Sequence, residues 1–117
     1  MTIRVKRVYD APTKEDGERI LVDRLWPRGM NKQSAALTDW MKDIAPSTEL
    51  RKWFHSKEGD WAEFQERYLN ELHRNPGVEA LRRRADAGTV TLLYAVRDEE
   101  HNHAQILARL LAEKQKG

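Results

Sequence analysis

The sequence contains no cysteine. This absence excludes disulfide bonds, thiolate catalysis and sulfur-ligated zinc or iron sites. The glycines never fall in the patterns G-x-G-x-x-G or G-x-x-x-x-G-K, so the chain has neither a dinucleotide-binding fingerprint nor a P-loop. We therefore predict no cofactor.

Long apolar runs are also missing, and none approaches the ~18 residues of a membrane span. The opening segment, MTIRVKRVYD, alternates apolar with basic side chains, which predicts a first strand rather than a signal peptide. We expect a cytoplasmic protein with no membrane partner. An excess of one charge is missing as well, because 21 basic and 19 acidic residues give a formal net charge of +2. A dedicated nucleic-acid-binding protein usually segregates more charge.

The residues that are present suit one folded domain, and a length of 117 residues predicts a single α/β domain over residues 1–117. The segment 19–25 carries Ile20, Leu21 and Val22 in sequence, and the segment 89–96 is a second apolar run. Both segments predict strands covered on both faces, which is typical of a parallel sheet. Residues 3–9 predict a half-exposed strand. Only residues 10–18 separate the first two strands, which leaves both a parallel crossover and a tight hairpin open.

Capping signals and apolar periodicity predict the helices. Asp60 with Glu63 forms a variant of the capping box, and apolar residues then recur at helical spacing through residues 61–74. Further helical segments are predicted as a turn or two around residues 37–44, a short helix from the Ser47 cap to Phe54, a helix from Pro76 that stops at Gly88, and a last helix after Asp98. We therefore predict a small, mainly parallel sheet of about three strands flanked by four to five helices.

Polar residues cluster after two of the predicted strands, at the place where open α/β sheets bind ligands. The second strand is followed by Asp23, Arg24, Trp26, Pro27, Arg28 and Gly29. The third strand is followed by Arg97, Asp98, Glu99, Glu100, His101, Asn102 and His103. If the strands are parallel, both clusters lie at one edge of the sheet, and we predict an anion-binding pocket there.

Arginine is well suited to a bidentate grip on phosphate or carboxylate, and Arg24 and Arg28 would provide it. Gly29 would let the backbone approach a ligand closely, and Trp26 would stack on a ring of the ligand. Structural roles explain the same residues. Arg24 would then pair with a nearby acid, and Trp26 would belong to the core. The sequence leaves both interpretations open.

His103, Asp98 and Asp23 are the candidates for proton transfer. Asp98 also fits the role of a helix N-cap that accepts from the amide at position 101. His103 shares the inward face of the last predicted helix, where a satisfied core histidine is the alternative. His101 and His103 form an H-x-H pair, but residues two apart on a helix point about 200° away from each other. We therefore predict no metal site.

Five segments resemble a known family: RVYD, RILVDRLWPRGM, DIAPSTELRKWFH, FQERYLNEL and TLLYAVRDEEHNHAQIL. Together they are similar to the YeaO-like branch of DUF488, a bacterial family of domains of unknown function, over nearly the whole chain. The resemblance implies a compact α/β domain whose first two strands run parallel, and it brings no assigned reaction. Larger relatives carry a cysteine just before the histidine that corresponds to His103, whereas this chain has Asn102.

The resemblance also implies a set of motif positions, which include several of the candidates above. They are Asp23, Arg24, Trp26, Pro27, Arg28, Gly29, Ala45, Pro46, Ser47, Arg51, His55, Arg67, Tyr68, Tyr94, Asp98, Asn102 and His103. Tyr94 and Asn102 join the predicted ligand-binding residues on this ground.

Three functions are compatible with the sequence. The leading hypothesis is a pocket for an anionic small molecule, with acid/base or hydrolytic chemistry if the protein is an enzyme. The second is a weak nucleic-acid-binding module that uses the basic residues Arg4, Lys6, Arg7, Arg28 and Lys32 with Trp26 as a stacking surface. The third is a small adaptor that contacts a protein through Trp40, Trp53 and Trp61. The sequence does not predict the oligomeric state.

Overall fold

The computed structural model describes residues 1–113. In this part of the chain four strands form one sheet: β1 Thr2–Arg7, β2 Glu18–Leu21, β3 Asp39–Trp40 and β4 Thr89–Tyr94. The helices are α1 Lys32–Ala35, α2 Thr48–Phe54, α3 Trp61–His73, α4 Gly77–Ala87 and α5 His103–Ala112, with short 3-10 turns η1 Lys14–Asp16 and η2 Lys42–Ile44. The prediction of an α/β fold is confirmed, with four strands instead of about three.

The strand order is β1-β4-β2-β3, and every neighbouring pair is parallel. β1 lies beside β4 from Thr2 opposite Thr89 to Arg7 opposite Tyr94. Because β1 and β2 are both parallel to β4, they are parallel to each other, as the family resemblance implied. The alternative of a tight hairpin between them is excluded.

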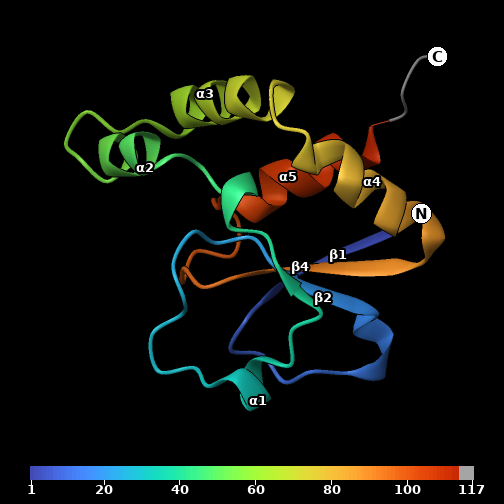
Figure 1. The fold of residues 1–117 in the computed structure, drawn as a ribbon. Coiled ribbons are helices and arrows are strands. Elements are labelled where there is room, and N and C mark those ends of the chain that lie inside the picture. Colours follow the sequence, from blue (N-terminus) through green and yellow to red (C-terminus); the bar gives the residue numbers. More distant parts are fainter. Residues whose placement is uncertain (114–117) are drawn as a thin grey trace.

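The sheet separates two apolar cores of unequal size. Helices α3, α4 and α5 lie on one side of it and α1 lies on the other (Figure 1). Side chains along β2 alternate between the sides, because successive residues of a strand point to opposite faces. Ile20 and Val22 pack in the larger core under the helices, whereas Leu21 packs with Val8 and Leu93 in the smaller one. Both faces of β2 and β4 are therefore covered, which explains their continuous apolar runs.

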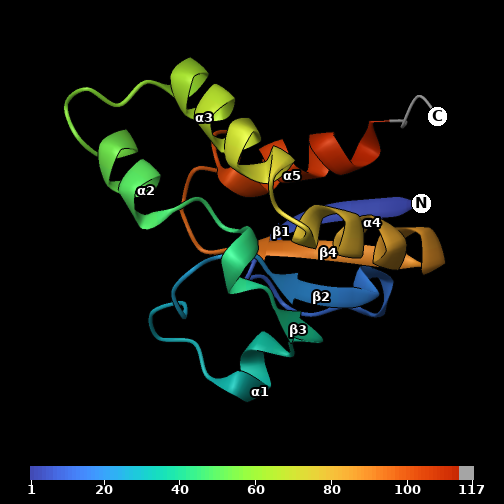
Figure 2. The same ribbon diagram turned by 45° about the horizontal axis from the view of Figure 1, so that its top comes forward.

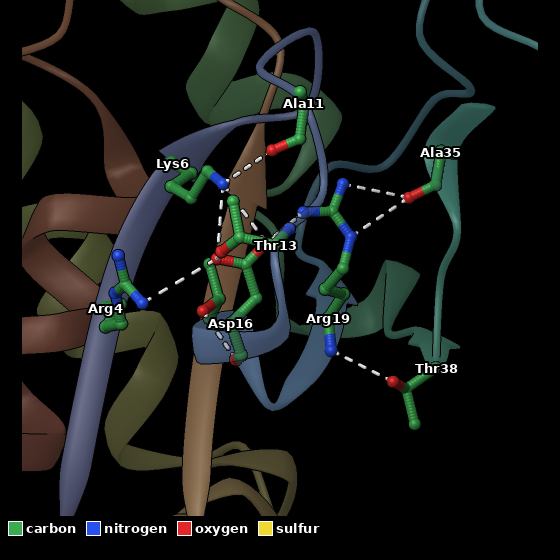
Figure 3. A network of polar contacts seen from close by, with 9 residues as sticks. Arg4, Lys6, Ala11, Thr13, Asp16, Arg19, Ala35 and Thr38 are labelled. Atoms are coloured by element: carbon green, nitrogen blue, oxygen red, sulfur yellow. Dashed lines mark hydrogen bonds and ion pairs between the residues drawn. The ribbon is translucent and has the colours of Figure 1, made fainter.

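The crossover from β1 to β2 is short and is organised around the buried side chain of Asp16 (Figure 3). Its carboxylate accepts hydrogen bonds from Arg19 Nη1 at 2.6 Å, from Lys6 Nζ at 3.1 Å and from the Thr13 amide at 3.0 Å. Burial alone would raise the pKa of Asp16, but the hydrogen bonds from Thr13, Lys6 and Arg19 outweigh it and hold that pKa well below its usual range. Asp16 is thus a fully paired structural charge.

Gly17 lets the chain turn from this crossover into β2. Its φ is +61°, and a Cβ atom there would lie 2.3 Å from the carbonyl oxygen of Thr89. The Thr91 hydroxyl also donates to the Asp16 carbonyl oxygen at 2.7 Å, which fastens the crossover to β4. A close approach of backbone to β4 therefore replaces the longer helical connection that usually joins parallel strands.

Several boundaries differ from the prediction. The turn or two expected at residues 37–44 is only the turn η2, because Asp39–Trp40 is instead the edge strand β3, and α1 lies before it. The last helix begins at His103 and not directly after Asp98, because Asn102 is its N-cap and accepts from the Gln105 amide at 3.0 Å. No helix within residues 1–113 is long and apolar enough to cross a membrane.

Candidate functional site

A cavity of about 260 Å³ lies beyond the carboxyl ends of β2 and β4. Its lining residues are Asp23, Arg24, Ala45, Pro46, Arg51, Phe54, His55, Phe64, Val96, Asp98, His101, Asn102 and His103. The chain that leaves β4 runs to the start of α5 on the side of the molecule where α2 lies (Figure 2). The segments near residues 24 and 100, which the sequence analysis expected to share one edge of the sheet, therefore meet.

His103 joins the two segments at the floor of the site. Its Nε2 lies 2.9 Å from the carbonyl oxygen of Val22 and 3.0 Å from Asp23 Oδ1. Only the contact with Val22 has hydrogen-bond geometry, and because a carbonyl oxygen only accepts, Nε2 carries a proton.

Asp23 is held at the same point by the backbone that leaves β4. Its Oδ2 accepts from the Ala95 amide at 3.0 Å. Its Oδ1 is buried and accepts no hydrogen bond from any residue in the described part of the chain. Natural proteins rarely leave a buried polar atom in this state, so Asp23 is unusual among the residues of this fold.

Arg24 reaches across the cavity to the segment that precedes α2. Its guanidinium donates to the carbonyl oxygens of Pro46 at 3.3 Å and Ala45 at 3.2 Å. The nearest carboxylate is that of Asp43, whose side chain is fully exposed and whose Oδ1 lies 3.9 Å from Arg24 Nη1. Neutral carbonyl groups hold Arg24 in place, and its positive charge is only weakly compensated.

Arg51 brings a second guanidinium to the cavity from α2. Ser47 begins this helix: its Oγ accepts from the Leu50 amide at 3.1 Å and donates to Glu71 Oε2 at 2.6 Å. Within residues 1–113 the Arg51 side chain makes no hydrogen bond or ion pair, although the side chain is half-buried. The site therefore contains two arginine side chains that approach one small volume.

The remaining walls are mostly apolar. Phe54 of α2 stacks on Phe64 of α3 with ring centroids 4.4 Å apart, and both rings line the cavity. Val96, Ala45 and Pro46 complete this apolar surface. A cavity that is mainly apolar and holds a few convergent polar groups has the composition of a small-molecule site.

Asp98 lines the cavity mouth, where its carboxylate organises a tight turn. Oδ1 accepts from the His101 amide at 2.9 Å and from the Glu100 amide at 3.0 Å. These backbone hydrogen bonds, first from His101 and then from Glu100, lower the pKa of Asp98. The predicted bond to position 101 is present, but it belongs to a turn before the helix. The carboxylate is thus a poor candidate for a general acid near neutral pH.

Asn102 and the two neighbouring histidines have separate roles. Asn102 is buried and uses both ends of its amide, because Nδ2 donates to the Asp98 carbonyl oxygen at 2.9 Å while Oδ1 caps α5. His101 is exposed and packs edge-on against Trp61, whereas His103 points to Asp23. No group of three His, Asp or Glu side chains in the described range could hold a metal ion.

Four predicted ligand-binding residues lie outside the cavity lining: Trp26, Arg28, Gly29 and Tyr94. Trp26 packs on Trp40 at 5.4 Å and donates from Nε1 to the Met30 carbonyl oxygen, so its alternative core role applies. Arg28 and Gly29 are exposed in the loop that follows. Tyr94 is buried among the core residues, and this burial raises its pKa. The chain turns to the other face of the sheet after Arg24. Trp26, Arg28 and Gly29 therefore lie away from the cavity that Arg24 lines.

The residues of the two alternative hypotheses are largely engaged in the fold. On β1, Lys6 binds Asp16, and Arg7 donates to the carbonyl oxygens of Ala95 and Val96 at 2.8 and 2.9 Å. The three tryptophans proposed as protein contacts, Trp40, Trp53 and Trp61, are each half-buried and packed against other side chains.

Reasoning from residue chemistry alone did not select Arg51, Phe54, Phe64, Pro46 or His55 as site residues. These residues come from α2, α3 and the segment before α2, which only the tertiary structure brings to the edge of the sheet. The signal that could have found some of them is the family resemblance, whose motif positions include Pro46, Arg51 and His55.

A family model described as "Inactive DUF488-N3 subclade" matches residues 2–117. The chain belongs to the DUF488 family. This DUF488 protein is 51% identical over 110 residues to "Uncharacterized protein YeaO" of Escherichia coli (strain K12), an alignment that covers 92% of the chain and 95% of the relative. The resemblance to the YeaO-like branch is thereby confirmed.

Mycobacterial relatives of this DUF488 protein are similar over the same extent. The chain is 42% identical over 109 residues to "Uncharacterized protein Rv3073c" of Mycobacterium tuberculosis (strain ATCC 25618 / H37Rv), covering 93% of the chain and 92% of the relative. The same figures hold for "Uncharacterized protein Mb3100c" of Mycobacterium bovis. No solved structure matches the chain at a significant level.

Proposed function

We propose that this DUF488 protein binds a small organic anion in the cavity at the carboxyl edge of its sheet. The observation that carries the proposal is that Arg24 and Arg51 both line a volume of about 260 Å³. The only ion pair of Arg24 within residues 1–113 is a 3.9 Å contact with the fully exposed Asp43, and Arg51 has no ion pair in that part of the chain. Guanidinium groups placed in this way suit a carboxylate or a phosphate. The aromatic and aliphatic walls favour a ligand with an apolar body over a bare inorganic ion.

The start of α5 adds to the positive potential of the cavity. The first amides of a helix have no intrahelical acceptor, and the helix dipole places partial positive charge at this end. Asn102 caps only the amide of Gln105, and both Asn102 and His103 line the cavity. An anion between Arg24, Arg51 and this helix end would meet favourable charge on several sides.

We further propose that the site binds its ligand without catalysing a reaction. His103 has Nε2 committed to Val22, and the Asp98 carboxylate holds a turn. Asn102 lies at the position where larger relatives carry a cysteine. Both ends of its side-chain amide are hydrogen-bonded, to the Asp98 carbonyl oxygen and to the Gln105 amide at the start of α5. The matching family model is described as inactive, which agrees with a binding role.

The proposal predicts that Arg51 determines affinity for the anion. We expect 3-phenylpropionate, which joins one carboxylate to one phenyl ring, to bind the wild-type chain at millimolar concentrations in a calorimetric or NMR titration. Arg51→Ala should weaken this binding about 10- to 100-fold, because a hydrogen bond between charged groups is lost.

Arg28→Ala is the matched control, because Arg28 is exposed and does not line the cavity. It should leave the affinity unchanged. The proposal is wrong if the wild-type chain does not bind the compound, or if Arg28→Ala weakens binding as much as Arg51→Ala does.

A further inference from the structure

We infer that Glu71 is a positioning residue of the cavity, because it holds the start of α2 in the place from which Arg51 reaches the bound anion. Glu71 itself does not line the cavity. This inference rests on the proposed function and adds the residue that sets its selectivity for an anion. It is carried by contacts between α2 and α3, which the proposed function does not use.

The first observation is that the Glu71 carboxylate binds two donors of one residue. Oε1 accepts from the Ser47 amide at 2.9 Å, and Oε2 accepts from Ser47 Oγ at 2.6 Å. Hydrogen bonds to a charged group are the stronger ones, and two of them fix the orientation of Ser47 as well as its position. We call this pair of bonds the Ser47 clamp. Since Glu71 lies on α3, the clamp fastens the start of α2 to another helix.

The second observation is that the capping box of α2 is completed from outside the helix. Ser47 is the N-cap, and its Oγ accepts from the Leu50 amide at 3.1 Å. In an ordinary capping box a Glu or Gln at the position of Leu50 accepts from the amide of the cap. The leucine has no acceptor, and Glu71 supplies it instead. A helix of seven residues needs tertiary support, so α2 depends on this contact.

The third observation is that no contact fixes the end of the Arg51 side chain. This half-buried side chain makes no hydrogen bond or ion pair within residues 1–113. The Arg51 amide, however, donates to the Ser47 carbonyl oxygen at 3.0 Å, as the N-cap of a helix requires. The place of the guanidinium group therefore follows the place of α2, whose start the clamp holds.

The fourth observation is that the surroundings of α2 have attachments of their own. The segment just before Ser47 accepts hydrogen bonds from the Tyr68 hydroxyl and from the Arg24 guanidinium. At the other end of α2, Phe54 stacks on Phe64. Loss of the clamp should therefore release the start of α2 while the rest of the cavity wall stays in place.

The test compares 3-phenylpropionate with 3-phenylpropanamide, its neutral amide, in NMR titrations of the whole chain. Both compounds have the same apolar body, so the ratio of their affinities reports how well the site recognises the carboxylate. A general loss of folding stability weakens both and leaves the ratio unchanged. We expect the wild-type chain to prefer the carboxylate by about tenfold or more, and Arg51→Ala to lose most of this preference.

Glu71→Ala should also lose most of the preference, because the start of α2 is released. The sign of this effect is informative, because removing a negative charge would by itself favour an anion. Glu66→Ala is the matched control, since Glu66 is exposed on the same helix and does not line the cavity, and it should keep the wild-type ratio. Glu71→Gln should retain more of the preference than Glu71→Ala, because glutamine also accepts from the amide of a cap.

The outcomes separate the inference from the function on which it rests. If Glu71→Ala keeps or raises the wild-type ratio while Arg51→Ala lowers it, the inference is wrong and the anion site stands. A Glu71→Gln ratio no better than that of Glu71→Ala would also overturn the inference. If Glu71→Ala does not fold, Ser47→Ala takes its place and should lower the ratio, because it removes the hydroxyl bond of the clamp. A wild-type chain that binds neither compound, or both equally, would overturn the proposed function itself.

Discussion

Asp16 and Asp23 flank the same strand, one before β2 and one after it, and the fold treats their carboxylates differently. Asp16 is completely buried, and both of its oxygens accept hydrogen bonds from Lys6, Thr13 and Arg19. Asp23 accepts a hydrogen bond through one oxygen only, from the Ala95 amide, and its other oxygen is buried 3.0 Å from His103 Nε2 without hydrogen-bond geometry. The arginines of the two regions differ as well, because Arg19 is bound to Asp16, whereas Arg51 makes no hydrogen bond or ion pair within residues 1–113.

This difference separates a structural charge cluster from a candidate binding site. A buried ion pair that is fully hydrogen-bonded has no remaining capacity for a ligand, and removing one partner leaves the others buried and uncompensated. A cavity lined by a guanidinium group that makes no hydrogen bond or ion pair within the described residues has that capacity. Charge composition alone would not separate the two regions, since both contain Asp and Arg side chains at the ends of one strand.

The largest expected effect is the loss of stability when Asp16, the fully hydrogen-bonded carboxylate, is removed. Asp16→Ala should lower the free energy of unfolding by about 3–5 kcal/mol, because Arg19 and Lys6 would lose their buried counter-charge. Chemical denaturation at neutral pH measures this loss. Asp10→Ala, in the same loop but exposed, should change stability by less than about 0.5 kcal/mol. If Asp16→Ala loses less than about 1 kcal/mol, a loss similar to that of the Asp10→Ala control, then Asp16 does not have this structural role.

A smaller and pH-dependent effect follows from the lowered pKa of Asp16. Its folded-state pKa lies below the ordinary aspartate value of 3.8, so its contribution to stability is fully present above that pH and is lost progressively as the pH falls below it. The stability difference between wild type and Asp16→Ala should therefore shrink between neutral pH and about pH 2.5. A difference that stays constant over this range would show that the carboxylate is not held ionised by the fold.

The sequence predicts the sheet well because its central strands have a simple pattern. The apolar runs that contain Ile20 to Val22 and Val90 to Tyr94 are covered on both faces, as their composition indicates. β3 escapes prediction because two residues carry no periodicity, and it exists only because its backbone pairs with β2. The start of α5 was misplaced because the Asp98 side chain accepts from the His101 amide as an N-cap would, four residues before the true cap at Asn102.

The candidate site is harder to predict than the sheet. Residues close in sequence lie in different places in the fold, and residues far apart in sequence are in contact. Asp23 and His103 lie 3.0 Å apart although 80 residues separate them, a meeting that parallel strands make predictable. Arg28 follows Arg24 closely in sequence, yet the chain turns away and leaves Arg28 exposed in the loop. Arg51 reaches the cavity from a helix whose placement depends on long-range packing. Hydrogen-bond saturation, which separates Asp16 from Asp23, also requires coordinates.

The measurement that tests this account most directly is the unfolding of Arg51→Ala with and without 3-phenylpropionate. Without the compound, its stability should lie within about 0.5 kcal/mol of wild type, because Arg51 makes no ion pair or hydrogen bond in the described structure. At about ten times the wild-type Kd, the compound should stabilise the wild-type chain by about 1.4 kcal/mol and the variant by much less. A variant that loses several kcal/mol alone, or gains as much as wild type, would contradict the account.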